Sequence, residues 1–159
     1  MSAPIEEESR RIFERRMLAH YNLDEKKLRR LAMFFLVHSH IDLKLIALVV
    51  KAETEKRKQK GTLSLDDHKS LSLKWSNGTF TQHLNWAKER RLLDSNEVRI
   101  AEETNRARDH FIHFEVGRFQ LPHYFGKDVT SEDGYRQFLL DAMTFDGDVC
   151  IPELLLKAK

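Results

Sequence analysis

One short stretch of the sequence, residues 106–114, concentrates side chains that can bind anions and transfer protons. It reads RARDHFIHF and holds two arginines, one aspartate and two histidines among apolar residues. Histidine is the side chain best suited to exchange a proton near neutral pH, and arginine presents a fixed cation to a phosphate. The combination indicates acid–base chemistry beside a phosphate group, whereas the alternative is a solvated helix face with a weak Arg106–Asp109 ion pair.

A helix is expected to carry this stretch. Asp94, followed three residues later by Glu97, is typical of the acidic cap that begins a helix. Gly117 and then Pro122 are typical of a helix end. We therefore expect a helix from about Asp94 to about Val116.

That helix should have two contrasting faces, because successive residues are rotated by roughly 100°. An apolar stripe is expected to face the core, made of Ile100, Thr104, Ala107, Phe111 and Phe114. Arg108 and Ile112 lie on the flank of the helix. The remaining polar side chains gather on the side away from the stripe, and they are Arg106, Asp109, His110 and His113.

The rest of the chain also has helical patterns, and no alternating strand pattern of useful length occurs. After a polar break at residues 59–70, a short helical piece is expected to end near residue 76, and another is expected to begin at Pro152. The main helices are expected over residues 5–20, 26–58, 79–93 and 135–145. The chain is therefore predicted to be all-α, an up-down bundle of about four main helices with a C-terminal helical extension, in one domain of residues 1–159.

The most apolar segment, residues 31–50, could be a membrane span or a buried central helix. A span would put His38, His40, Asp42 and Lys44 at mid-bilayer, where charges are costly. We expect instead a buried helix with part of its surface facing a partner subunit, and no membrane partner. The acidic start of the chain is unlike a signal peptide, and a single cysteine excludes an internal disulfide. These features favour a cytoplasmic protein.

A metal centre is the other interpretation of the two histidines. His110 and His113 have a spacing of three residues, but a full ligand set would need His38, His40 or His83 to lie nearby in the fold. We expect no metal and no cofactor.

The charge distribution allows a nucleic-acid partner without requiring one. The formal net charge is +2, with basic clusters in residues 51–60 and 88–91. Residues 128–153 hold seven acidic side chains and one arginine. A polyanion could therefore approach one side of the molecule.

The run Arg108-Asp109-His110-Phe111-Ile112-His113 resembles the motif of HEPN domains, in which an arginine and a polar residue precede a histidine. HEPN domains are helical bundles found in prokaryotic toxin–antitoxin, abortive-infection and CRISPR-associated ribonucleases. The resemblance covers residues 26–117. It includes a His-Ile-Asp element at 40–42, a Phe-led helix at 80–93 and a Leu-Leu-Asp-Ser-x-Glu junction. Mannitol operon repressor-like proteins share this layout, while the acidic C-terminal extension, residues 118–159, resembles nothing in it.

The resemblance implies a metal-independent endoribonuclease that works as a homodimer on RNA, as a toxin or defence effector with a cognate antitoxin or regulatory protein. His113 would act as general acid or base, Arg108 would stabilise the phosphate and Asp109 would orient one of them. Arg106 and His110 would bind substrate. Arg106 also has an acceptable spacing from His113, so the choice of catalytic arginine is open, and the polar residue after it favours Arg108.

The resemblance also implies an alternative function. The repressor-like relatives keep the fold without the chemistry, so the chain could be a catalytically inactive dimer that acts as a transcriptional regulator or a protein-interaction module. The intact arginine, polar residue and histidine favour the enzyme.

Overall fold

The computed structural model describes residues 3–61, 64–112 and 120–145. These residues form six helices and one small antiparallel hairpin, in which β1 (His123–Tyr124) pairs with β2 (Lys127–Asp128). The helices are α1 (Ala3–His20), α2 (Glu25–Gln59), α3 (Leu65–Ser76), α4 (Phe80–Glu89), α5 (Ser95–Ile112) and α6 (Glu132–Phe145). The all-α class is therefore confirmed. The hairpin was not expected, because strands of two residues are too short to show an alternating pattern.

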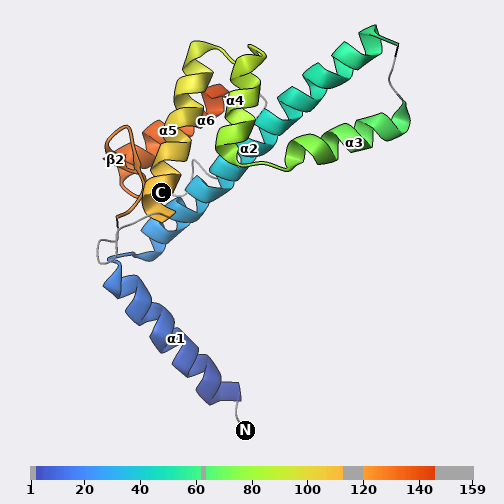
Figure 1. Cartoon of the computed structure of the whole chain (residues 1–159). Helices are drawn as coiled ribbons and strands as arrows, with labels where there is room; N and C mark the ends of the chain where they lie inside the picture. Colours follow the sequence, from blue (N-terminus) through green and yellow to red (C-terminus); the bar gives the residue numbers. More distant parts are fainter. Residues whose placement is uncertain (1–2, 62–63, 113–119, 146–159) are drawn as a thin grey trace.

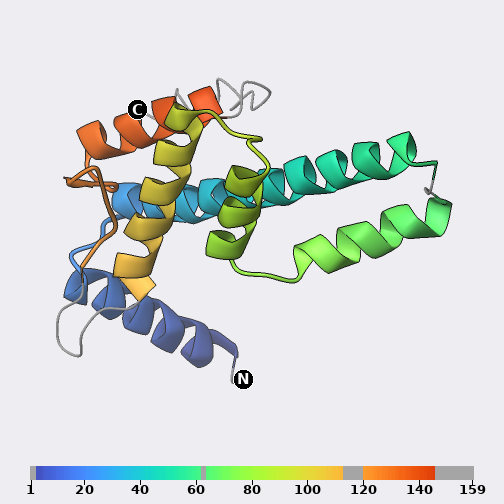
Figure 2. The ribbon, with the colours of Figure 1, turned by 45° about the horizontal axis from the view of Figure 1, so that its top comes forward.

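Helix α2 is the axis of the molecule. It contacts α3, α4, α5 and α6, and Figure 1 shows it running the full length of the fold. Figure 2 shows α6 beside one half of α2 and α3 beside the other half. The side chains of α2 that face these helices recur every three or four residues, as expected for one face of a helix, and they are Leu31, Phe34, His38, Ile41, Leu45 and Val49.

The opposite face of α2 is not covered by the other residues that the structure describes. By length and composition alone α2 could cross a membrane, and 33% of its most apolar window is buried. The core helix of a water-soluble protein and a signal sequence pass the same test of length and composition. Leu36 and Leu43 each expose 64% of their surface. The expected central helix is therefore buried on one side and apolar on an uncovered side.

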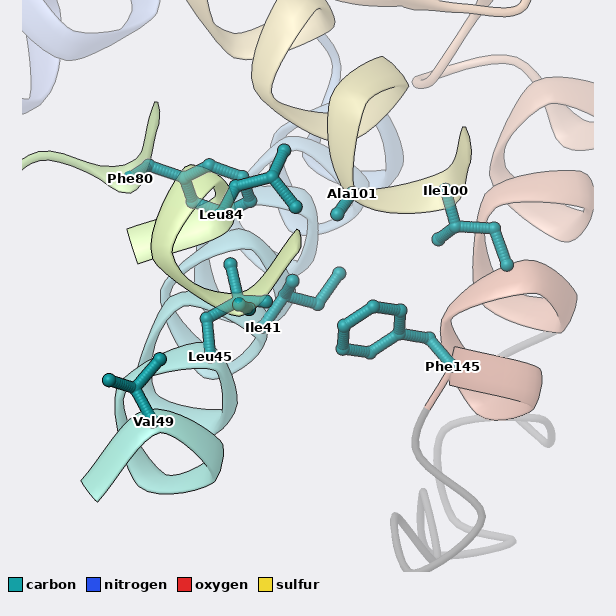
Figure 3. Close-up of a cluster of buried hydrophobic side chains, with 9 residues drawn as sticks. Ile41, Leu45, Val49, Phe80, Leu84, Ile100, Ala101 and Phe145 are labelled. Carbon is teal, nitrogen blue, oxygen red and sulfur yellow. The ribbon is translucent and has the colours of Figure 1, made fainter. Parts of the chain in front are cut away.

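The main core lies where four helices meet. Figure 3 shows Ile41, Leu45 and Val49 of α2 directed toward Leu84 of α4, with side chains of α5 and Phe145 of α6 closing the cluster. Each fully buried side chain of this size stabilises the fold by about 1.5–3 kcal/mol relative to exposure. This cluster fixes α4 and α5 beside each other on α2.

A second cluster fastens α6 and the hairpin to the same axis. Phe34 of α2 packs with Ala107, Tyr124 and Phe138. The Tyr124 hydroxyl donates a hydrogen bond of 3.0 Å to Asp141. The end of β2 lies so close to the first turn of α6 that a Cβ on Gly134 would lie 2.1 Å from the backbone oxygen of Asp128. Only glycine allows that approach.

The helix boundaries differ from the sequence prediction chiefly at three places, one of which is the start of α6 at Glu132 instead of residue 135. The polar break is shorter than expected, because Ser64 caps α3 in a capping box with Asp67. Helix α4 ends at Glu89 instead of residue 93, because Arg91 has a left-handed backbone with φ of 54°. Residues 113–119 and 146–159 lie outside the described residues, and they include His113, Phe114, Gly117 and the segment that begins at Pro152.

Helix α1 extends away from the other helices (Figure 1). Its apolar side chains Ile12, Phe13 and Met17 are exposed, and its surface carries ion pairs between residues four positions apart, such as Arg11–Glu7. An 18-residue helix of this kind gains little stability from its own backbone in water. Its apolar stripe is therefore a second uncovered surface.

Adjacent leucines on α6 provide a test of the packing. Leu139 is 4% exposed and Leu140 is 51% exposed. We expect Leu139→Ala to lower the free energy of unfolding by about 2–5 kcal/mol, because it leaves a cavity under α6. Leu140→Ala should change it by less than about 0.5 kcal/mol. Urea denaturation followed by circular dichroism measures both, and equal effects would contradict the assigned faces of α6.

Candidate functional site

Helix α5 carries the residues for which the sequence predicted chemistry. Its first turn is fixed by a reciprocal cap. The Asp94 carboxylate accepts a hydrogen bond of 2.8 Å from the Glu97 backbone N–H, and the Glu97 carboxylate accepts one of 2.8 Å from the Asp94 N–H. The acidic start of this helix was correctly predicted from the spacing of the two residues.

The core-facing stripe of α5 is confirmed over the described residues. Ile100, Thr104 and Ala107 are buried, and the Thr104 hydroxyl donates to the Ile100 backbone oxygen at 2.8 Å. Phe111 packs against Phe35 of α2 with ring centroids 5.2 Å apart. This packing fixes the rotation of α5 about its axis.

The opposite side of α5 faces a groove. Arg106, Asp109 and His110 line a shallow cavity of about 350 Å³. Thr81, Leu84 and Asn85 of α4 form the other wall. Glu102 and Asn105 of α5 complete the lining. The convergence expected from the helix rotation is therefore present for these three residues, and α4 makes the surface concave. His113 lies outside the described residues.

Arg106 has a strong acidic partner. Its guanidinium holds both carboxylate oxygens of Glu103, one of them through Nε at 2.8 Å. The Glu103 carboxylate also accepts a hydrogen bond of 2.6 Å from the Phe125 N–H of the hairpin. Burial alone would raise the pKa of Glu103, but the hydrogen bonds from Arg106 and Phe125 outweigh burial and hold that pKa below its ordinary value. Arg106 thus connects α5 to the hairpin.

Arg108 does not line the cavity itself but contacts Asp109, which does. Its Nη1 donates to Asp109 Oδ1 at 3.0 Å, and the side chain is 37% exposed. The other carboxylate oxygen of Asp109 accepts from Asn105 Nδ2 at 3.2 Å. Asp109 is therefore held on two sides, and it holds Arg108 in turn. This contact agrees with an orienting role for Asp109.

His38 belongs to the same group of polar side chains. From the sequence it was a functional candidate only as a metal ligand. It lies 67 positions before Asn105 in the chain, and its Nε2 is 3.4 Å from Asn105 Oδ1. The ring is 8% exposed and stacks on Phe80 at 4.6 Å between centroids. Nothing in the local pattern of α2 indicates that His38 reaches α5, because the contact arises from helix packing.

The environment of His38 lowers its pKa from the ordinary value of 6.5. Burial is the main cause, since it disfavours the charged imidazolium, and the positive charge of Arg108 acts in the same direction. The Asn105 hydrogen bond and the carboxylates of Asp42 and Asp109 oppose the shift without cancelling it. His38 is therefore neutral at neutral pH.

The other histidines considered as metal ligands do not form a cluster in the described residues. Within the described ranges, no group of three or more His, Cys, Asp or Glu side chains is arranged to hold a metal ion. His83 instead pairs with Asp42 through Nδ1 at 2.6 Å. Its buried Nε2 faces Gly78, where a Cβ would lie 2.8 Å away. The His83–Asp42 pair joins α4 to α2.

Comparisons with known proteins do not assign this chain to a family. No protein-family model, no curated protein and no solved structure matches it. The groove between α4 and α5 must therefore be interpreted from its own residues.

The lowered pKa of His38 has a consequence for stability. Because the folded protein keeps His38 neutral, the unfolded chain binds a proton here at a higher pH than the folded chain does. We expect the free energy of unfolding to fall as pH decreases from 6.5 toward the lower folded-state pKa. This part of the pH dependence should be absent from His38→Gln.

Urea denaturation of the wild type and His38→Gln, at about pH 7.5 and about pH 5, measures this difference in slope. NMR titration of the imidazole gives the pKa of His38 directly. A titration midpoint at or above 6.5 would contradict the expected environment.

Proposed function

We propose that this chain is a metal-independent endoribonuclease of the HEPN type that acts in the cytoplasm and binds RNA in the groove between α4 and α5. The observation that supports it most is the convergence of Arg106, Asp109 and His110 on that groove, with Arg108 paired to Asp109 beside it in the chain. The chain continues from α5 directly to His113, the histidine of the motif.

The reaction we propose is an internal transesterification. His113 accepts the proton of a ribose 2′-hydroxyl, the 2′-oxygen attacks phosphorus, and the bond from phosphorus to the 5′-oxygen breaks. The leaving 5′-oxygen takes a proton from a second histidine, which a homodimer supplies from its other subunit. Arg108 stabilises the charge that develops on the phosphate oxygens. The products are a 2′,3′-cyclic phosphate and a 5′-hydroxyl.

The contacts of the two arginines support Arg108 as the catalytic one. Arg106 directs two of its nitrogens, Nε and Nη2, at the two oxygens of Glu103. Among the described residues, Arg108 makes its ion pair with Asp109 through Nη1, and a guanidinium has five N–H donors. Arg106 and His110 then serve as part of the wall that binds substrate.

The charges of the groove are compatible with a polyanion. Each carboxylate near the bound phosphate would have a cationic partner: Glu102 pairs with Lys88 at 2.6 Å, Glu103 with Arg106, and Asp109 with Arg108. Such pairing reduces the repulsion that unpaired carboxylates would exert on an RNA backbone. The uncharged groups of the lining, Thr81, Asn85 and Asn105, are of the kind that hydrogen-bond to exposed bases.

A homodimer is part of the proposal, because one chain offers a single His113. Two exposed apolar surfaces support it. One is the outer face of α2 with Leu36 and Leu43, and the other is the stripe of Ile12, Phe13 and Met17 on α1. Exposed apolar surfaces often mark protein–protein contacts, and a second copy of the chain is the partner that the proposed reaction requires.

The same apolar surfaces also support the second candidate function, a catalytically inactive dimer that acts as a regulator or binds a partner protein. In that case the polar residues of α5 have structural roles, as the Arg106–Glu103 contact already does. Absence of RNA cleavage in a folded dimer would favour this function over the nuclease.

We expect the purified protein to cleave mixed RNA in the presence of EDTA. His113→Ala should lower kcat by about 10²–10⁴-fold, because it removes the proton-transfer group. Arg108→Ala should lower it by about 10²–10³-fold, because it removes charge stabilisation. Gel analysis of labelled RNA and detection of the cyclic phosphate measure both effects.

Arg106→Ala is the matched control for the arginine assignment. It should keep kcat and raise KM, since Arg106 contributes to binding. If Arg106→Ala abolishes cleavage while Arg108→Ala retains it, the roles of the two arginines are reversed. Intact RNA with the wild-type protein over a range of pH would refute the nuclease.

We expect light scattering at micromolar concentration to show a dimer. The double substitution Leu36→Lys and Leu43→Lys should give a folded monomer, because it places two charges on the apolar face of α2. Leu73→Lys on α3 is the matched control, since Leu73 is also exposed but lies outside both apolar surfaces. A monomeric wild type would contradict the shared cleft.

A further inference from the structure

The contacts around Asn105 connect the buried face of α2 to the edge of the groove. His38 Nε2 meets Asn105 Oδ1 at 3.4 Å, and Asn105 Nδ2 meets Asp109 Oδ2 at 3.2 Å. Asp109 Oδ1 in turn accepts from Arg108 Nη1 at 3.0 Å. Four side chains from two helices therefore form one continuous chain of polar contacts, which ends at the arginine assigned to phosphate stabilisation.

The donor and the acceptor in each of these contacts follow from the chemistry of the four side chains. An ionised carboxylate only accepts hydrogen bonds, so Asn105 must present its amide nitrogen to Asp109. The Thr81 hydroxyl, 3.3 Å from the same nitrogen, accepts the second amide hydrogen. The Asn105 oxygen is then directed at His38, and a neutral imidazole can meet it only as a donor through Nε2–H.

The packing of His38 in the core holds one end of this series of polar contacts in place. Its ring stacks on Phe80, which belongs to the main core, and it is 8% exposed. Asn105, by contrast, lies on the wall of the groove. The buried ring therefore fixes the oxygen end of the Asn105 amide, while Thr81 and Asp109 accept from its nitrogen.

We propose that His38 and Asn105 are positioning residues that hold the Asp109–Arg108 pair in the geometry required at the groove. This inference rests on the proposed function for its catalytic consequence. Neither residue touches the reacting atoms. Both act through Asp109, and a displacement of about 1 Å in a catalytic group lowers rates by up to about 100-fold.

The test compares two substitutions of the same histidine. His38→Phe keeps the stacking on Phe80 and removes the donor, whereas His38→Gln removes the stacking and keeps an N–H where Nε2 lies. We expect His38→Phe to lower kcat by about tenfold with little change in KM, and His38→Gln to recover most of it. His40→Gln, at an exposed position on the same helix, should match the wild type.

A second variant interrupts the same series of contacts at Asn105, on the wall of the groove. Asn105→Asp cannot donate to Asp109, and its position is only half-buried, so the fold should tolerate it. We expect its loss of kcat to equal that of His38→Phe, and the double variant to lose no more than either single one, because all three interrupt one chain. Additive losses would overturn the proposal, as would full activity of His38→Phe.

A measurement that needs no RNA tests the positioning role independently of the nuclease activity. ¹⁵N relaxation at Arg108 Nε reports how ordered the guanidinium is. We expect an ordered Arg108 in the wild type and His38→Gln, and a mobile one in His38→Phe and Asn105→Asp. An Arg108 equally ordered in all four proteins refutes the positioning role. If the RNA is not cleaved but Arg108 is ordered and mobile in the four proteins as expected, only the nuclease function is refuted.

Discussion

Burial of one face of α2 determines where the other helices lie. Positions along this face recur every three or four residues from Leu31 to Val49, so a single long helix presents a continuous apolar stripe. Helices α3, α4, α5 and α6 each cover part of it, and the aromatic side chains of α6 extend the core at both ends. Since the hydrophobic effect is proportional to the area covered, α2 is the main support of α3 and α4, whereas α5 and α6 are held by each other as well as by α2.

The groove is a consequence of that arrangement. Helix α5 must direct Ile100, Thr104 and Ala107 into the core, so the residues about half a turn away from that stripe point outward. Helix α4 is fixed beside α5 by Leu84 and Ala87. The polar face of α5 therefore borders a shallow groove beside α4, while Arg106 and His110 remain exposed to solvent. The packing of the α5 stripe into the core and the packing of α4 beside α5 thus together produce a concave polar site.

Much of this could be predicted from the sequence, because it depends on spacing within one helix. The cap at Asp94, the core stripe and the gathering of Arg106, Asp109 and His110 all follow from positions three or four residues apart. What could not be predicted depends on contacts between distant segments. The Glu103–Phe125 bond joins α5 to the hairpin, and the His38–Asn105 contact spans 67 positions. Neither leaves a local periodicity to detect.

Those long-range contacts change the meaning of residues that look equivalent in the sequence. Arg106 and Arg108 are both acceptable arginines by spacing, yet Arg106 is committed to the hairpin through Glu103. Arg108 is instead linked through Asp109 and Asn105 to a histidine fixed in the core. A guanidinium that closes a structural ion pair can line the binding wall, but it cannot turn to the scissile phosphate without leaving a half-buried carboxylate unpaired, which is costly. An arginine whose partner is itself held at the groove can bind a phosphate while keeping its ion pair. The packing of α2 against α5 therefore distinguishes two arginines between which spacing alone could not choose.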